Sequence, residues 1–438
     1  MKGLRAMPDN TKQPREYDAV LGGKNPPPVD GVVLGGLEGA KRSFANSDEN
    51  YRVLALSQLI NYRQEGWDLV IQALKDPSKR VQLAAYKLLG DISELKVKQA
   101  ILEFNPYRFF ECVYTIELNK YYDAAIAIHP DGKTLVCCDA SDSSYEESQR
   151  DGSIVDGTYL DFKKWDLKTG KSLHTINKTF ATRMKDYPEH LTFSSDAQTL
   201  AIVGYQHDKT IITEIWNLNT EQLSHLISGQ PLGDSRIRTR NTITATTLSS
   251  DGKILASGNE AGQIIVWDLE NKQNIDITKG HLQRITSVAI NADTNILASA
   301  SYDKPIKIWD FRTGSEIYTL VGEDTFDYNS NRVLLAISPN GKTLITSDHH
   351  MPKLIRIWDL ITGKEIHKLF SNTDPLRCLT FSADGKIFVS CGGDINIWNL
   401  QTQELLAKLP DATSVAISPD GQTIVSYVGK LIQVWRVP

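Results

Sequence analysis

A short phrase built around tryptophan recurs seven times in the last three quarters of the chain, and it constrains the fold more than any other feature. In order, the copies read KKWDL, EIWNL, IVWDL, KIWDF, RIWDL, NIWNL and QVWRV. Their tryptophans are Trp165, Trp216, Trp267, Trp309, Trp358, Trp398 and Trp435. Successive tryptophans are 37 to 51 residues apart, which brackets the period of about 40–45 residues found for repeat units of four strands. The chain is therefore expected to build seven similar β-sheets.

Each repeat has the residue pattern of four short antiparallel strands. An apolar run such as residues 287–290 leads into a tight turn, and a second run such as residues 253–258 follows. The third strand ends at the tryptophan, and the fourth follows a polar turn. The turns between the first two strands contain pairs that supply positive φ angles, namely Asp131-Gly132, Asp251-Gly252, Asn340-Gly341, Asp384-Gly385 and Asp420-Gly421. The pattern predicts a mainly β fold, a seven-bladed β-propeller over residues 111–438.

The fourth repeat carries the fullest version of the motif. Gly280-His281 precedes its first strand, the run LASASYD ends at Asp303, and IWD includes Trp309. Over residues 111–438 the chain resembles WD-repeat proteins of the β-transducin kind. The resemblance implies that His281, Ser299 or Ser301, Asp303 and Trp309 form a buried hydrogen-bonded set with a structural role. The other repeats lack Gly-His before their first strand, so we expect their blades to depend more on packing.

The last repeat ends three residues after Trp435 and lacks a fourth strand of its own. A segment with alternating β-branched and aromatic residues, ECVYTIEL, lies directly before the first complete repeat, at residues 111–118. We expect this segment to supply the outer strand of the last blade. Such a closure covers an edge that would otherwise be exposed and joins the two ends of the domain.

Two shorter segments precede the propeller. Residues 1–46 form a Gly/Pro-rich leader, with three consecutive prolines at 26–28. Residues 47–105 show apolar residues at helical spacing in four runs, and residues 66–92 resemble a HEAT or armadillo helical pair. The sequence therefore predicts a small α-helical, HEAT-like module before the propeller. The leader and helices together resemble the front end of certain cyanobacterial WD-repeat proteins.

Composition limits the partners and the compartment. The net charge of −5 argues against recruitment of nucleic acid or anionic membrane by the overall field. The five cysteines have no C-x-x-C spacing, which is typical of a reducing compartment and argues against a disulfide framework or a zinc site. We find neither a signal peptide nor an apolar run of membrane-spanning length. A cytoplasmic location without membrane insertion is expected.

Motifs that carry chemistry are missing or have structural explanations. The chain has neither a phosphate-binding loop nor a Gly-x-Ser-x-Gly nucleophile elbow. His349-His350 could contribute to a metal site, but no third ligand is placed beside them. We therefore expect no catalytic residues, no metal and no cofactor.

Charged loops on one rim are the candidate partner site. Six basic residues fall in the connections before the second and third repeats, Lys178, Arg183, Lys185, Arg236, Arg238 and Arg240. Acidic residues flank this basic arc, within residues 140–158 on one side and 323–327 on the other. The leading hypothesis is a non-enzymatic scaffold or adaptor that binds other proteins. The alternatives are a propeller that binds nucleic acid through the basic arc and, third, one that binds a small molecule or metal or has catalytic activity.

Overall fold

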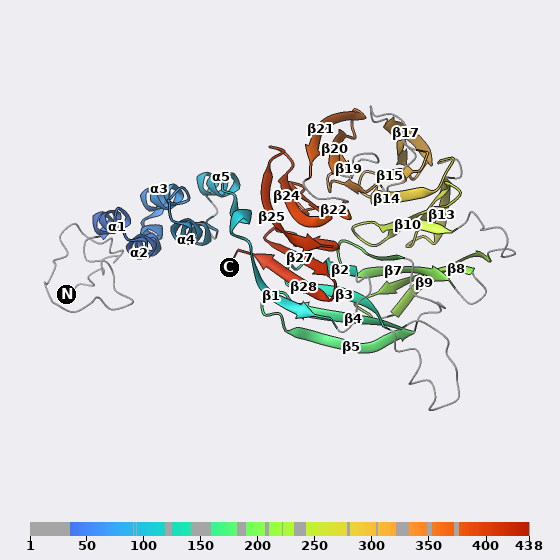
Figure 1. Cartoon of the computed structure of the whole chain (residues 1–438), viewed down its shortest axis with the longest axis horizontal. Coiled ribbons are helices and arrows are strands. Elements are labelled where there is room, and N and C mark those ends of the chain that lie inside the picture. The colour runs from blue at the N-terminus through green and yellow to red at the C-terminus, as the bar shows by residue number, and fades with distance from the viewer. Residues whose placement is uncertain are drawn as a thin grey trace, which may run out of the picture. The chain divides into compact units, whose positions relative to one another are not determined.

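The computed structural model divides the chain into two compact units, residues 1–109 and residues 110–438. The structure describes residues 36–90, 92, 94–118, 125–141, 159–181, 190–205, 210–220, 222–231, 242–277, 281–303, 305–320, 333–347, 353–371 and 376–437. Helices make up the described part of the first unit, and β-strands make up most of the second (Figure 1).

The first unit is helical in its described part. Its elements are α1 (Gly36–Phe44), α2 (Glu49–Leu59), the 3-10 helix η1 (Ile60–Tyr62), α3 (Arg63–Ala73), α4 (Lys79–Leu89), α5 (Leu95–Glu103) and the 3-10 helix η2 (Pro106–Phe109). The last four α-helices contain the apolar runs predicted for the helical module, which confirms helices before the propeller. Helix α1 lies within residues 1–46, where the sequence analysis expected only a leader.

Apolar residues from several helices form the core of this unit, and a partly buried ion pair joins two of its parts. Leu56, Val70 and Val81, from three helices, are fully buried. Ser78 follows the predicted break at Pro77 and caps α4, where its hydroxyl accepts a hydrogen bond from the Val81 N–H. Arg52 binds both carboxylate oxygens of Asp76 at 3.0 Å, which fastens α2 to the α3–α4 turn.

The second unit contains seven four-stranded antiparallel sheets among the described residues, which confirms the seven-bladed propeller (Figure 1). The first three blades comprise β2 (Ala125–Ile128), β3 (Thr134–Ser141), β4 (Tyr159–Asp166) and β5 (Ser172–Ala181); β6 (His190–Phe193), β7 (Thr199–Tyr205), β8 (Thr210–Asn217) and β9 (Gln222–Pro231); and β10 (Ile243–Leu248), β11 (Ile254–Asn259), β12 (Ile264–Asp268) and β13 (Gln273–Ile277). The fourth and fifth blades comprise β14 (Ile285–Asn291), β15 (Ile296–Ser301), β16 (Ile306–Asp310) and β17 (Ser315–Leu320); and β18 (Leu335–Ile337), β19 (Thr343–Ser347), β20 (Leu354–Asp359) and β21 (Lys364–Phe370). The last two comprise β22 (Cys378–Phe381), β23 (Ile387–Cys391), β24 (Gly393–Asn399) and β25 (Leu405–Ala412); and β26 (Ser414–Ile417), β27 (Thr423–Val428), β28 (Leu431–Arg436) and β1 (Glu111–Glu117).

The seventh blade combines both ends of the propeller sequence. Its outer strand is β1, which pairs antiparallel with β28 from Glu111 opposite Arg436 to Glu117 opposite Leu431. This is the position that the sequence analysis assigned to residues 111–118. Tyr114 of β1 also donates a hydrogen bond from its hydroxyl to the Leu167 carbonyl in the first blade, at 2.5 Å. The ring is therefore closed both within the seventh blade and between blades seven and one.

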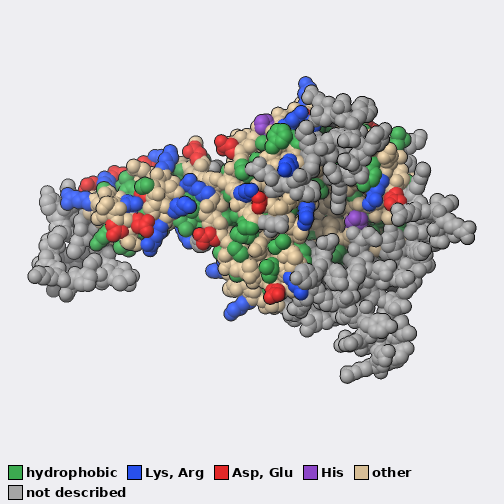
Figure 2. Space-filling view, viewed as in Figure 1, with side chains coloured by type: hydrophobic (Ala, Val, Ile, Leu, Met, Phe, Trp, Pro, Cys, Tyr) green, Lys and Arg blue, Asp and Glu red, His purple; other side chains and the backbone are tan. Residues whose placement is uncertain are grey.

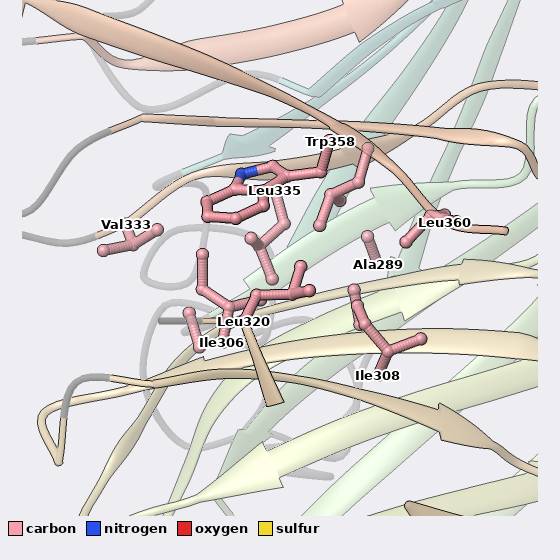
Figure 3. Packing of buried hydrophobic residues seen from close by; sticks show 11 residues of the cluster. Ala289, Ile306, Ile308, Leu320, Val333, Leu335, Trp358 and Leu360 are labelled. Carbon is pink, nitrogen blue, oxygen red and sulfur yellow. The ribbon is translucent and has the colours of Figure 1, made fainter. Parts of the chain in front are cut away.

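Neighbouring blades pack face to face through apolar side chains. In the cluster between blades four and five, Trp358 of β20 is 4% exposed and packs with Leu320, Leu335 and Ile306 (Figure 3). A side chain of this size removes about 150–250 Å² from water when buried. The recurring tryptophans therefore contribute to the core between blades as well as marking the third strand.

Candidate functional site

The polar residues of the fourth blade form one connected hydrogen-bonded network. His281 Nδ1 lies 2.8 Å from Asp303 Oδ1, and His281 Nε2 lies 2.8 Å from Ser299 Oγ. Ser299 Oγ also accepts a hydrogen bond from Trp309 Nε1 at 2.9 Å. Ser301 bonds instead to the Gln283 carbonyl and to the Asp303 backbone N–H. Ser299 is therefore the serine that bridges histidine and tryptophan.

With a neutral His281 imidazole, every donor in the network has an acceptor. Nδ1–H then donates to Asp303, Nε2 accepts from the Ser299 hydroxyl, and the same hydroxyl oxygen accepts from Trp309. Burial by itself raises the pKa of Asp303, but hydrogen bonds from His281, the Leu282 N–H and Ser301 together hold that pKa below its ordinary value. Asp303 therefore remains an ionised anchor at neutral pH. These side chains hydrogen-bond to one another, so their role is to stabilise the blade.

The predicted tryptophans lie on the third strands of the seven blades: Trp165 on β4, Trp216 on β8, Trp267 on β12, Trp309 on β16, Trp358 on β20, Trp398 on β24 and Trp435 on β28. In blades five to seven the indole again donates to a hydroxyl on the second strand, namely from Trp358 to Thr346, from Trp398 to Ser390 and from Trp435 to Ser426. In blade two, Trp216 donates to the buried Glu214 at 3.0 Å.

These bonds were not anticipated from the sequence, although a signal for them exists. Trp309 lies opposite Leu297, and the hydroxyl belongs to the residue two positions later on the second strand. The same offset holds for Trp358, opposite Leu344, and for the last two blades. Blades two, five, six and seven thus bury a polar tryptophan partner without the Gly-His motif, so the expectation that they depend more on packing was incomplete.

One end of the propeller is built from rigid turns. In five turns between first and second strands, a serine hydroxyl bonds to the carboxylate or amide two residues later and also accepts the N–H five residues later. These serines are Ser194, Ser249, Ser338, Ser382 and Ser418. In the blades of the first four of these serines, a backbone bond also joins this turn to the turn after the third strand, as from the Leu360 N–H to the Lys342 carbonyl at 2.8 Å.

A cavity of about 1070 Å³ lies at the centre of the ring. All seven innermost strands line it, mostly with apolar and hydroxyl side chains such as Ile126, Leu191, Ala289 and Thr380. The described lining also includes the acidic residue Asp293 and the basic residue Arg377. A space of this size and lining suits a small or extended ligand.

The predicted partner-binding residues lie outside the described part of the structure. This applies to Arg183, Lys185, Arg236, Arg238 and Arg240, to the side chain of Lys178, and to the acidic segments beside them. His349-His350 also falls there. On the face drawn in Figure 2, the described Lys and Arg side chains of the helical unit are interspersed with Asp and Glu.

The described residues provide neither a metal cluster nor a membrane-spanning helix. Within the ranges given above, no group of three or more His, Cys, Asp or Glu side chains is placed to hold a metal ion. Among the helices described, none has the length and apolar character needed to cross a bilayer.

Comparison with known proteins gives one family match and two relatives. The family model "WD domain, G-beta repeat" matches residues 225–268, 272–310 and 363–399. The chain is 29% identical over 136 residues to eukaryotic translation initiation factor 3 subunit I of Bombyx mori, a match that covers 30% of this chain and 38% of that protein. It is 32% identical over 94 residues to U3 small nucleolar RNA-interacting protein 2 of Mus musculus, covering 20% of this chain and 18% of that protein.

The matched segments agree with the blades. Residues 272–310 run from the outer strand of blade three to Trp309, and residues 363–399 end at the corresponding strand of blade six. The matched units are thus WD40 repeats, and the chain that carries them folds as a seven-bladed β-propeller.

Proposed function

We propose that this protein is a non-enzymatic scaffold or adaptor that binds other proteins. The observation that carries the proposal is the closed ring of seven WD-repeat blades, which holds surface residues at fixed positions. His281, Ser299 and Asp303, which in other settings can perform acid–base chemistry, are engaged inside one blade. Similarity to a protein named as a subunit of an initiation factor also favours a role within an assembly.

The docking surface that we propose is the rim carrying the basic arc, Lys178, Arg183, Lys185, Arg236, Arg238 and Arg240. Acidic segments on both sides of the arc give the rim an alternating charge pattern. Such a pattern chiefly sets the orientation and rate of association. A partner with an acidic surface facing the arc fits this chemistry. The helical unit offers a second contact area, because Tyr51 and Leu54 on α2 are 55% and 60% exposed.

Affinity purification from source cells tests this proposal. The wild-type chain is compared with the triple reversal Arg236→Glu, Arg238→Glu and Arg240→Glu. A matched control reverses three exposed lysines in the tight turns, Lys171→Glu, Lys272→Glu and Lys342→Glu. We expect the rim variant to lose specific partners that wild type and control retain. The same set of bound proteins in all three samples would contradict the docking rim.

RNA binding through the same arc is the second candidate. It is favoured by the similarity to a protein whose name describes it as interacting with a small nucleolar RNA. For a single strand, the logarithm of the binding constant falls as the logarithm of the salt concentration rises. The slope is about −0.7 for each phosphate that the protein contacts. Titration of a labelled single-stranded RNA at rising salt distinguishes this candidate, since a flat response argues against it. We also propose a cytoplasmic location, which fluorescent tagging in source cells would test.

A further inference from the structure

Two cysteines in the sixth blade lie directly opposite each other beside the central cavity. Cys378 on β22 is the Cα partner of Cys391 on β23, and their Sγ atoms are 2.6 Å apart. Both are free thiols. Cys391 is fully buried, whereas Cys378 is partly exposed and lines the cavity.

The backbone at this pair already has the dimensions that a disulfide needs. Directly opposed residues in an antiparallel pair have Cα atoms about 4.5–5.5 Å apart, inside the range of about 4.4–6.8 Å that disulfides span. The Arg377 N–H donates to the Cys391 carbonyl at 2.6 Å, which fixes the two strand ends beside each other. Gly392 and Gly393 follow Cys391 directly, so the backbone there can adjust at little steric cost.

We propose that Cys378 and Cys391 form a reversible disulfide, and that Cys378 is the thiol that reacts first with a small anionic disulfide entering the central cavity. This inference is independent of the proposed scaffold function. Exposure to the cavity selects Cys378 as the attacking group, because thiol–disulfide exchange requires access. The neighbouring Arg377 is exposed and lines the cavity too, and its charge attracts an anionic reagent.

The reaction proceeds by two exchanges. The Cys378 thiolate attacks one sulfur of the small disulfide, which forms a mixed disulfide and releases one small thiolate that takes up a proton. Cys391 then loses its proton and attacks Cys378 Sγ, which forms the Sγ–Sγ bond and releases the second small thiol. The two protein thiols are thereby oxidised, and one small disulfide is reduced to two small thiols.

The environments of the two sulfurs support this order. The hydrogen bond with the Cys378 thiol and burial raise the pKa of the Cys391 thiol. Cys391 is therefore held protonated until the mixed disulfide has formed beside it. The remaining cysteines have other surroundings: Cys137 and Cys138 are buried in the first blade, and Cys112 is exposed on β1.

Peptide mapping of the full-length protein tests the proposal with oxidised glutathione as the probe. After alkylation of remaining thiols, trypsin separates Cys378 and Cys391 onto different peptides, residues 378–386 and 387–408. In the wild type we expect these peptides to be joined, two fewer alkylated thiols, and full recovery after treatment with dithiothreitol. Cys112→Ser should behave as wild type does.

The variants separate the two steps. Cys391→Ala should stop at a mixed disulfide, with one glutathione attached to Cys378. Cys378→Ser should leave Cys391 as a free thiol. A stable glutathione adduct on Cys378 in the wild type, or unmodified Cys378 when Cys112 has reacted, would overturn the proposal. The wild-type result decides the matter even if the Cys391 variant folds poorly.

Discussion

Trp309 Nε1 and Ser299 Oγ, 2.9 Å apart, join the third strand of the fourth blade to its second. The serine is 0% exposed and serves His281 as well, so one hydroxyl group satisfies two buried partners. A buried polar group that loses its hydrogen-bond partner destabilises the fold, because it gave up its hydrogen bonds to water when it was buried.

Replacing this hydroxyl should therefore destabilise the propeller. We expect Ser299→Ala to lower the free energy of unfolding by about 1–3 kcal/mol, since Trp309 Nε1 and His281 Nε2 lose their partner. Urea denaturation followed by tryptophan fluorescence measures the change. Ser315→Ala, at an exposed position on the outer strand of the same blade, is the control and should change little. Equal effects of the two substitutions would contradict the structural role.

The lowered pKa of Asp303 predicts a specific acid sensitivity. An ionised carboxylate that is favoured in the folded state stabilises the protein above the unfolded pKa of about 3.9. This contribution is lost as the pH falls through the lower folded value. The Asp303→Asn variant lacks this stabilising contribution at every pH. The stability difference between wild type and Asp303→Asn should be constant near neutrality and shrink below about pH 4. Urea titrations from pH 7 to pH 3 measure it, and a gap that persists undiminished at the acid end would count against this role.

The closing strand should support the whole ring. Deletion of residues 111–118 removes β1 and leaves one edge of β28 unpaired, so we expect a lower melting temperature for the entire propeller. Calorimetry or near-ultraviolet circular dichroism monitors the transition. Deletion of α1 in the helical unit is the comparison, and it should leave the propeller transition in place. Wild-type melting after loss of residues 111–118 would refute the closure.

Two glycines allow the contact between blades seven and one to be isolated. Gly170 and Gly132 both have positive φ angles, +68° and +64°. A Cβ at Gly170 would lie 3.0 Å from the ring of Tyr114, whereas a Cβ at Gly132 would meet nothing within 4 Å. Alanine at either site must adopt the left-handed backbone conformation, which costs about 1–2 kcal/mol of stability. Gly170→Ala should cost about 1–3 kcal/mol more, because it also displaces Tyr114.

A mutant cycle measures this contact. The additional cost of Gly170→Ala should disappear when Tyr114 is replaced by alanine, since the clash is then removed. Denaturant unfolding of the wild type, the two single variants and the double variant supplies the four free energies. If the extra cost of Gly170→Ala stays the same when Tyr114 is replaced by alanine, the effect comes from the turn and not from the contact with Tyr114.

The propeller fold could be predicted from the sequence because the same motif repeats along the chain. The tryptophan period and the Asp-Gly turns carry local information for each sheet, and seven copies reinforce one another. The need for an outer strand after Trp435 likewise directed attention to residues 111–118. Apolar runs at helical spacing located α2 to α5, but α1 was missed because Gly35-Gly36 and few large apolar residues made that segment look like a leader.

The site was harder to predict because its contacts depend on register across strands. Ser299 was one of two candidates until pairing of Trp309 with Leu297 placed it beside the indole. The bond between Trp216 and Glu214 follows no motif, since a carboxylate replaces the usual hydroxyl. Likewise, Cys378 and Cys391 are separated by 13 in residue number, which suggests no proximity until a hairpin brings them together.

The pairing of β1 with β28 also imposes an order on biosynthesis. During translation β1 is made before blades one to six, and its partner strand β28 is made after them. A nascent chain can therefore assemble the first six blades while this early strand still has no partner. Completion of the ring waits until β28 has been made, and until then the edges of β1 are open to pairing with other chains.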